Sequence, residues 1–268
     1  MPGELVFIGL GLNDEKDLSL RGLETIREAN TIFAELYTNL MPTFSLSRLE
    51  RLSKKTISVV SRRDLEEKSG DKILDAAKKG KTVLLVPGDP LIATTHVDLR
   101  IRAEKQGVKT QIVHGASIIS AVIGLSGLQN YKFGRSVTIP FPSEFSSVET
   151  PYTVVMENMR RGLHTLCFLD IRAEDQRYMT IQQGLEVLLE IEKRKRKHVI
   201  TPGTLAVGIA RAGSSHPIVK ARFVTELMNC EFGPPPHSLV FPGRLHFVEA
   251  EALVTFAEAP ESVTELVR

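Results

Sequence analysis

The segment TVLLVPGDPLIATTH, residues 82–96, contains the pattern that decides the fold class of this chain. Thr82 to Val86 is an unbroken apolar run of the kind found in strands buried on both faces of a parallel sheet. Two prolines then restrict the backbone on either side of Gly88 and Asp89. Rigid loops at the carboxyl ends of parallel strands are where α/β proteins bind ligands. The segment therefore predicts an α/β fold with a ligand loop, although the same residues would also suit an ordinary turn.

Outward from this segment, apolar strands alternate with helical patterns through the first half of the chain, which is typical of a mostly parallel sheet with crossover helices. Strands are expected at residues 5–10, 31–34, 55–60, 82–86 and 110–113, and helices at 19–29, 72–79, 97–106 and from 118 onward. Gly80 follows the second of these helices and suits the left-handed position that ends a helix.

The pattern changes at residues 131–142, where one glycine and two prolines interrupt a short extended stretch. We therefore expect an N-terminal α/β domain at residues 1–138 and a C-terminal α/β domain at 139–268. The second domain should contain a helix ending at 162, strands at 165–171, 205–210, 218–223 and 239–241, and helices at 180–196 and 248–257. Its later strands lack intervening helices, so its sheet is predicted to be mixed.

The composition of the chain agrees with two folded domains and an unremarkable overall charge. The chain has 268 residues, of which 42% are apolar and 25% are charged. Lys and Arg number 34 against 32 for Asp and Glu, a formal charge of +2, so no direct nucleic-acid binding is expected. The basic run Lys193 to Lys197 is a local exception, and it fits either a solvated helix end or a contact with phosphate or an acidic protein.

Cysteine content and hydropathy point to a cytoplasmic protein that does not enter a membrane. Cys167 and Cys230 are the two cysteines, too few for a disulfide framework. Residues 1–11 lack the basic start and the cleavage site of a signal peptide. No uncharged apolar stretch of about 18 residues occurs anywhere in the chain.

Several common site chemistries are not supported by the residue spacing. Gly9 and Gly11 follow the first strand, but Asp14 stands where a dinucleotide fingerprint requires a third small residue, and its carboxylate would face the pyrophosphate. The histidines and cysteines show no metal-ligand spacing. The chain also lacks the G-x-S-x-G elbow of serine hydrolases. We therefore expect neither NAD or FAD, nor a metal, nor a hydrolytic serine.

Two stretches, Phe7 to Leu12 and Pro87 to His96, resemble the diphthine synthases of the tetrapyrrole methylase superfamily. The continuation Ala-Thr-Thr-His after the loop is the more specific part of the likeness. The resemblance extends over nearly the whole chain through residues 114–118, 131–134, 161–166, 169–171, 210–213 and 235–237.

The resemblance implies a homodimer whose subunits have two α/β domains with the cofactor in the interdomain cleft. The cofactor would be S-adenosylmethionine, released as S-adenosylhomocysteine, without a metal. The acceptor would be the amino group of the 3-amino-3-carboxypropyl-histidine of translation elongation factor 2, which methylation converts to diphthine, a step of diphthamide biosynthesis. The cofactor contacts implied by the family fall on Leu10, Asp89, Ile92, Ser117, Ile118, Leu169, Ala212 and His237.

Methyl transfer from a sulfonium makes few demands on the protein, which mainly positions the amine and excludes water. The amine must be unprotonated, and a free α-amino group with a reference pKa of about 8 readily loses its proton. A dedicated base is therefore optional. If one exists, His96 and Tyr37 are the candidates, since both are expected at loops beside the cofactor, but either could simply pack in the core.

Two alternative functions remain open at this stage. A precorrin-type tetrapyrrole methyltransferase would share the cofactor loops and differ in the acceptor cleft. A non-catalytic module that binds nucleotide or protein could use the same two domains, with the basic run as its contact. Bound S-adenosylhomocysteine in the purified protein would favour either methyltransferase, and a tetrapyrrole absorbance band would favour the first alternative. The number of methyl groups transferred, and whether the carboxylate is also esterified, does not follow from the sequence.

Overall fold

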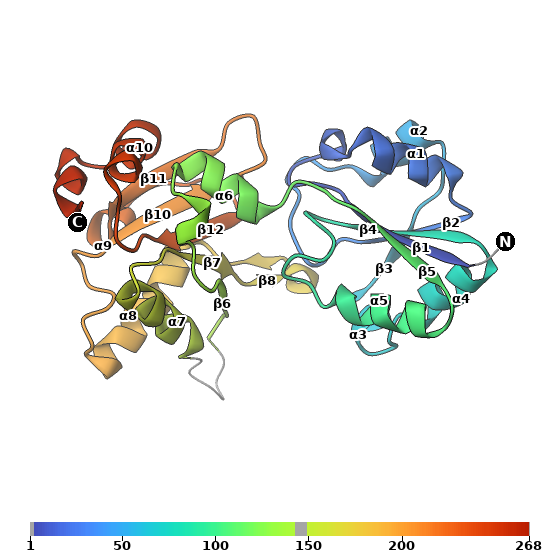
Figure 1. Ribbon diagram of the computed structural model, residues 1–268, viewed down its shortest axis with the longest axis horizontal. Helices are drawn as coiled ribbons and strands as arrows, with labels where there is room; N and C mark the ends of the chain where they lie inside the picture. Colours follow the sequence, from blue (N-terminus) through green and yellow to red (C-terminus); the bar gives the residue numbers. More distant parts are fainter. Residues whose placement is uncertain (1–2, 143–148, 268) are drawn as a thin grey trace. The chain divides into compact units, whose positions relative to one another are not determined.

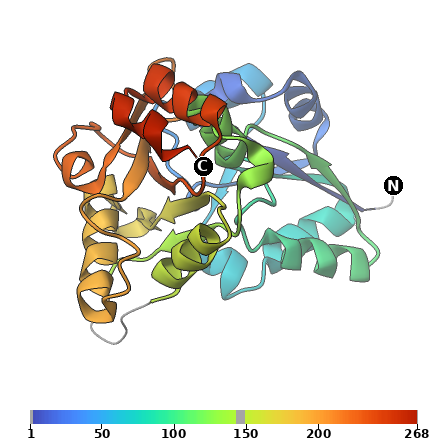
Figure 2. The ribbon, with the colours of Figure 1, turned by 60° about the vertical axis from the view of Figure 1, so that its left-hand side comes forward.

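The computed structural model describes residues 3–142 and 149–267, and contacts divide the chain into two compact units. Unit 1 comprises Met1–Ile118 together with Ala173–Asp175, and unit 2 comprises Ile119–Arg172 and Gln176–Arg268. Figures 1 and 2 show the elements of each unit from two directions. No helix in the described part is long and apolar enough to cross a membrane.

The division after Ile118 comes earlier in the chain than the expected boundary after residue 138. The difference arises because residues 130–139 make their contacts in the second sheet. Phe133 forms a β-bridge with His164, and strand β6 (Val137–Ile139) pairs in parallel with β7 (Thr165–Leu169). The prolines and glycine of this stretch interrupt a segment of unit 2 rather than join two units.

Unit 1 contains a five-stranded sheet in the order β3-β2-β4-β1-β5, and all its recorded strand pairs are parallel. The strands are β1 (Glu4–Gly9), β2 (Thr31–Glu35), β3 (Ser58–Val60), β4 (Lys81–Val86) and β5 (Lys109–Val113). The helices are α1 (Leu20–Glu28), α2 (Leu46–Ser53), α3 (Arg62–Glu66), α4 (Asp71–Lys79) and α5 (His96–Lys105). The expected parallel α/β arrangement is confirmed.

Alternate residues of β1 belong to two separate cores, one on each face of this sheet. Val6 and Ile8 pack with residues of α1 and α2, whereas Leu5 and Phe7 pack with residues of α4 and α5. Figure 1 shows these two helix layers on opposite faces of the sheet. All four side chains are completely buried, and burial of each contributes about 1.5–3 kcal/mol. Two helix layers explain why the central strands are apolar throughout.

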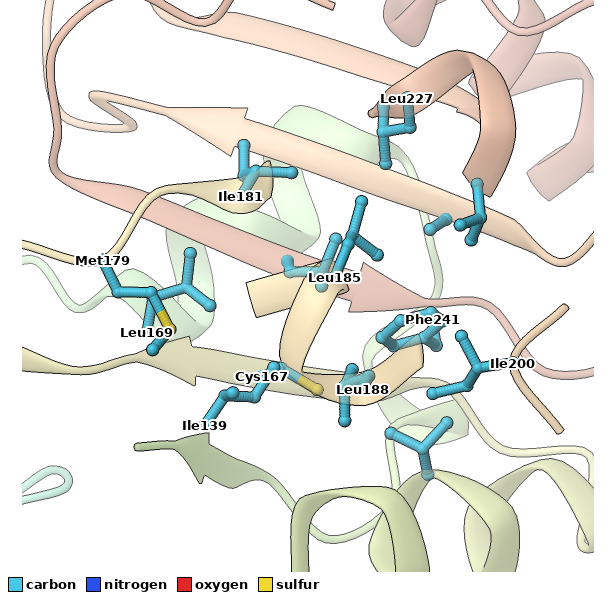
Figure 3. Packing of buried hydrophobic residues seen from close by; sticks show 14 of the residues in the cluster. Ile139, Cys167, Leu169, Met179, Ile181, Leu185, Leu188, Ile200, Leu227 and Phe241 are labelled. Atoms are coloured by element: carbon cyan, nitrogen blue, oxygen red, sulfur yellow. The ribbon is translucent and has the colours of Figure 1, made fainter. Parts of the chain in front are cut away.

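Unit 2 contains a mixed five-stranded sheet in the order β11-β10-β12-β7-β6, as predicted. The remaining strands are β10 (Leu205–Ala210), β11 (Ile218–Phe223), β12 (His237–Phe241) and the small hairpin β8 (Ile171–Arg172) with β9 (Arg177–Tyr178). The helices are α6 (Ile118–Ser126), α7 (Thr150–Arg160), α8 (Ile181–Lys195), α9 (Val224–Leu227) and α10 (Phe247–Ala257). Leu185 and Leu188 of α8 pack over Cys167 and Phe241 of the sheet (Figure 3).

Local signals predict most element ends, and Gly80 is the clearest exception. Ser19 caps α1, and Thr180 caps α8 through a capping box with Gln183, as side-chain acceptors at helix starts should. The left-handed conformation expected for Gly80 is wrong, because its φ of 167° is extended. Glycine is needed there for space: a Cβ would lie 2.6 Å from Oδ1 of Asn30, which accepts a hydrogen bond from the next amide, Lys81 N.

Two further expectations differ from the structure. The strand expected at 165–171 is interrupted at Asp170, whose Oδ2 accepts a hydrogen bond from Phe141 N and thereby ends β7. The short helices α2 and α3 and the hairpin β8–β9 have no counterpart among the expected elements. α3 and the hairpin are too short for periodicity to mark them, whereas in α2 Leu46, Leu49 and Leu52 follow a helical spacing after the capping Ser45 and were a usable signal.

Candidate active site

The loops that follow β1 and β4 meet at the carboxyl edge of the unit 1 sheet. β1 lies between β4 and β5 in parallel register. Leu10 N donates to Val86 O at 2.8 Å, and Gly11 and Gly88 exchange two backbone hydrogen bonds at 3.2 and 2.6 Å. Leu10 is completely buried, so its backbone and not its side chain borders the edge. The register of the sheet thus joins two of the segments singled out in the sequence.

Glycines allow the loop after β5 to pack against the loops after β1 and β4. A Cβ on Gly9 would lie 2.5 Å from Gly88 O and 2.6 Å from Gly115 N, and a Cβ on Gly115 would lie 2.5 Å from Gly88 O. No larger residue fits either position without displacement of neighbouring backbone. Gly11 and Gly88 have φ values of +79° and +73°, which glycine adopts without strain. The G-x-G pattern therefore serves backbone packing between three loops.

Asp89 is buried within this edge, and protein groups hold its carboxylate. Oδ2 lies 2.7 Å from Nδ1 of His114, and Oδ1 accepts a hydrogen bond from Leu91 N at 3.4 Å. Asp89 is 8% exposed, whereas the side chain of His114 is 76% exposed. The pair links the loop after β4 to the loop after β5, a contact that the sequence analysis did not identify. Ile92, farther along the same loop, is exposed.

Ser117 and Ile118 lie at the transition from the β5 loop to α6. Ser117 directly precedes this helix and Ile118 begins it. Amides at the start of a helix carry partial positive charge and favour acceptors. Through Gly115, this segment is packed against the loops that carry Leu10 and Asp89. The five predicted cofactor residues that belong to unit 1 therefore lie on three neighbouring loops.

The three predicted cofactor residues of unit 2 share one edge of the mixed sheet. β12 runs antiparallel to both β7 and β10, so the end of β7, the end of β10 and the start of β12 coincide. Leu169 ends β7, Ala212 follows β10, and His237 begins β12 opposite Ala210. Arg211, with φ of +51°, turns the chain after β10, and its Nη1 donates to Phe232 O at 2.8 Å and Pro234 O at 2.6 Å.

The ring of His237 is engaged inside unit 2. Nδ1 accepts a hydrogen bond from Ile181 N at 3.3 Å, and Nε2 donates to Gly233 O at 3.1 Å. These two bonds require the neutral ring, and burial lowers the pKa of His237.

Comparison with known proteins shows the family to which this chain belongs. Residues 4–227 match the model of the Tetrapyrrole (Corrin/Porphyrin) Methylases. The chain is 50% identical over 266 residues to a diphthine synthase of Methanococcoides burtonii, covering 97% of this chain and 98% of the relative. It is 45% identical over 256 residues to that of Methanocaldococcus jannaschii, covering 95% and 99%.

The chain belongs to the diphthine synthase family. A crystal structure of diphthine synthase matches with a TM-score of 0.89 and 42% identity, covering 98% of this chain and 99% of that one. A putative diphthine synthase from Entamoeba histolytica matches with a TM-score of 0.87 and 36% identity, covering 96% and 100%. Membership of this family makes the chain an S-adenosylmethionine-dependent methyltransferase.

The two residues considered as bases are both buried in unit 1. His96 begins α5, is 3% exposed, and its Nε2 lies 3.1 Å from Oε1 of Glu35, which is completely buried. Tyr37 is also buried, and burial followed by the charge of Glu35 raises its pKa. A phenol with a raised pKa remains protonated, so Tyr37 is unsuited to accept a proton. Glu35 was not identified from the sequence, although one acidic residue closing an apolar strand was a usable signal.

Two of the segments that resemble the diphthine synthases, residues 131–134 and 161–166, contribute buried contacts within unit 2. Glu249 and His164 are completely buried; Oε1 of Glu249 lies 2.8 Å from His164 Nε2, and Oε2 accepts from Lys132 Nζ. His164 Nδ1 accepts from Gly243 N at 2.9 Å, so its ring is neutral, and burial lowers its pKa. Among residues 3–142 and 149–267, no group of three or more His, Cys, Asp or Glu is placed to hold a metal ion.

Proposed function

We propose that this methyltransferase methylates the amino group of the 3-amino-3-carboxypropyl-histidine of translation elongation factor 2 and so produces diphthine for diphthamide biosynthesis. The observation that carries the proposal is 50% identity to a diphthine synthase over 97% of this chain. The position of the three glycine-packed loops at the carboxyl edge of a parallel sheet also supports it.

The cofactor residues proposed are Leu10, Asp89, Ile92, Ser117 and Ile118 from unit 1 and Leu169, Ala212 and His237 from unit 2. Within each unit, these residues lie on loops at one edge of its sheet. The unit 1 loops suit S-adenosylmethionine, because glycine at positions 9 and 115 lets three loops pack closely at one sheet edge, and the cofactor has no phosphate that Asp89 would repel. The buried Asp89 carboxylate is suited to accept hydrogen bonds from cofactor hydroxyl or amino groups.

When bound, S-adenosylmethionine supplies an electrophilic methyl group on a sulfonium. The amine lone pair forms the new N–C bond as the C–S bond breaks, and the electrons of that bond remain on sulfur. This chain must hold the amine about 3–3.5 Å from the methyl carbon and exclude water. The nitrogen must be unprotonated at that moment. His96, held by Glu35, is the better suited of the two proposed proton acceptors, because Tyr37 remains a phenol.

The test uses elongation factor 2 that carries the 3-amino-3-carboxypropyl group, incubated with the enzyme and S-adenosylmethionine. Intact-mass analysis should show whole methyl additions on the modified factor and none on the factor with unmodified histidine. The number of additions distinguishes a trimethylammonium product from one that is also esterified. Methylation of a precorrin and not of the modified factor would instead establish the tetrapyrrole alternative, and no transfer to either would favour a binding module.

We further propose that the enzyme is a cytoplasmic homodimer. Large apolar side chains exposed on α10 support association of two subunits: Phe247 and Val248 lie at the start of this helix and are 61% and 45% exposed. A second copy of unit 2 would cover these two side chains. Light scattering at micromolar concentration should give twice the mass of the 29.7 kDa chain, and a monomeric mass would contradict the proposal.

A further inference from the structure

The hydroxyl of Tyr37 is buried and has no hydrogen-bond partner among the residues that the structure describes. The whole residue is only 7% exposed. A buried hydroxyl without a partner is destabilising, and native proteins contain few of them. A ligand that donates an N–H to this hydroxyl would supply the missing hydrogen bond.

The register between β2 and β3 places Tyr37 beside the guanidinium of Arg62. Strands β2 and β3 are parallel neighbours with Glu35 opposite Val60, and Tyr37 and Arg62 each follow two residues later. The two residues therefore leave the same edge of the sheet side by side. The guanidinium of Arg62 lies 5.2 Å from the centroid of the Tyr37 ring, and Arg62 is exposed.

Glu35 holds the backbone of the segment that carries Tyr37. Glu35 Oε2 accepts hydrogen bonds from Tyr37 N and Thr38 N, each at 3.2 Å. After burial, the charges of Glu35, Glu66 and Glu174 raise the pKa of Tyr37, and Arg62 opposes them. Glu174 belongs to the short segment 173–175 that packs with unit 1. A neutral phenol can accept a hydrogen bond from an amine, and the exposed guanidinium beside it can bind a carboxylate, so the two side chains match an amino-acid head group, which has both groups on one carbon.

We propose that Tyr37 and Arg62 form the acceptor subsite, which binds the amine and the carboxylate of the side chain to be methylated. An amine N–H donates to Oη of Tyr37, which leaves the nitrogen lone pair available for attack. Arg62 binds the carboxylate through two parallel N–H···O bonds. The inference rests on the proposed function, because it names the head group of the proposed acceptor.

The position of this subsite fits methyl transfer. The other neighbour of β2 is β4, with Ala34 opposite Leu85, so the loop that carries Asp89 leaves the sheet beside the segment that carries Tyr37. His96, at the end of that loop, bonds to Glu35 within the same cluster. Acceptor and cofactor groups are thereby anchored to adjacent strands of one sheet.

The experiment compares Tyr37→Phe and Arg62→Gln with Arg63→Gln. Arg63 is the matched control, because it is the next residue of α3 and its side chain is 72% exposed in an ion pair with Glu67. Turnover of the modified elongation factor 2, calorimetric affinity for S-adenosylhomocysteine and thermal unfolding are measured for each protein. Tyr37→Phe should lower kcat/KM for the acceptor about 2- to 12-fold, and Arg62→Gln about 10- to 150-fold, mainly through KM.

Cofactor affinity should stay unchanged in both variants, and the thermal midpoint of Tyr37→Phe should be equal to or higher than that of the parent, since an unsatisfied hydroxyl is removed. Parent-like turnover by Tyr37→Phe, or equal effects of Arg62→Gln and Arg63→Gln, would overturn the subsite. A lowered midpoint with weaker cofactor binding in Tyr37→Phe would also overturn it, by revealing a structural role. Failure of the parent enzyme to methylate the modified factor would instead overturn the proposed function and, with it, the assignment of this acceptor.

Discussion

At the residue scale, Asp89 is the side chain on which cofactor affinity should depend most. Its carboxylate is buried and adjoins the glycines that join the three loops. A charge-assisted hydrogen bond contributes about 1.5–3 kcal/mol, so Asp89→Ala should weaken S-adenosylmethionine binding about 10- to 150-fold. The fold should be retained because Asp89 lies in a loop whose prolines remain. Calorimetric titration measures the effect, and parent-like affinity would refute the assignment of this loop to the cofactor.

Two further variants separate direct from indirect effects of Asp89. If the carboxylate acts only by holding His114 at 2.7 Å, His114→Ala should reproduce the loss of affinity. A smaller loss in His114→Ala would indicate that the carboxylate itself contacts the cofactor. Changing both Lys193 and Arg194 to Ala should leave cofactor affinity unchanged and at most slow association with the protein substrate.

At the element scale, packing between the loops after β1, β4 and β5 should be sensitive to a single methyl group. Gly115→Ala places a Cβ 2.5 Å from Gly88 O, and only backbone movement can relieve this contact. We expect about 1–3 kcal/mol of destabilisation and weaker S-adenosylhomocysteine binding. Gly124→Ala is the control, since its Cβ would meet nothing within 4 Å and helix α6 should gain about 0.5–1 kcal/mol. Denaturant unfolding and calorimetry of both variants check the prediction; equal behaviour would contradict it.

Glu249 ties α10 to two distant segments of unit 2, and acid should loosen this connection. Burial tends to raise its pKa, but hydrogen bonds from Lys132, Gln129, His246 and His164 outweigh burial and bring the pKa to about 2 from an ordinary 4.5. The resulting stability is present above pH 4.5 and is lost as the pH falls toward 2. The lowered pKa of His164 acts in the same direction below its ordinary 6.5.

Glu249→Gln should therefore lower the free energy of unfolding by about 3–5 kcal/mol at neutral pH, because Lys132 loses a buried partner. It should also flatten the decline in stability between pH 4.5 and 2. Glu258→Gln is the control, since its pair with Arg222 is a surface contact with 65% of the Glu258 side chain exposed and contributes at most about 1 kcal/mol. A parent-like acid profile in Glu249→Gln would show that this carboxylate does not link folding to pH.

At the scale of the whole molecule, cofactor binding should stabilise the chain without a metal. S-adenosylhomocysteine at about 100 times its Kd should add about 2.7 kcal/mol, which corresponds to a rise of roughly 5–10 °C in the thermal midpoint. A chelator should leave this rise unchanged, because the proposed contacts come from loop backbone and Asp89. Thermal scans with cofactor product, with and without chelator, provide the measurement, and loss of the rise in chelator would contradict metal-independent binding.

The sequence by itself determined the fold class, most element ends and the segments that carry the site. Leu205 to Ala210 was expected as a strand and is β10 with the same bounds, and Thr180 marks the start of α8. Such features are local, because apolar runs and capping side chains act within a few residues. The likeness to diphthine synthases in residues 87–96 is also contained in one continuous stretch.

Only the tertiary structure decided which distant residues meet. Glu35 and His96 are 61 positions apart, and His164 and Glu249 are 85 apart, yet each pair forms a buried hydrogen bond. The neighbours Tyr37 and Arg62 likewise depend on β2 pairing with β3 in one particular register. Strand order and register result from packing of the whole sheet against its helices, and no local propensity specifies them. This is why the sequence could nominate Tyr37 and His96 but could not reveal that both are buried, or which charges surround them.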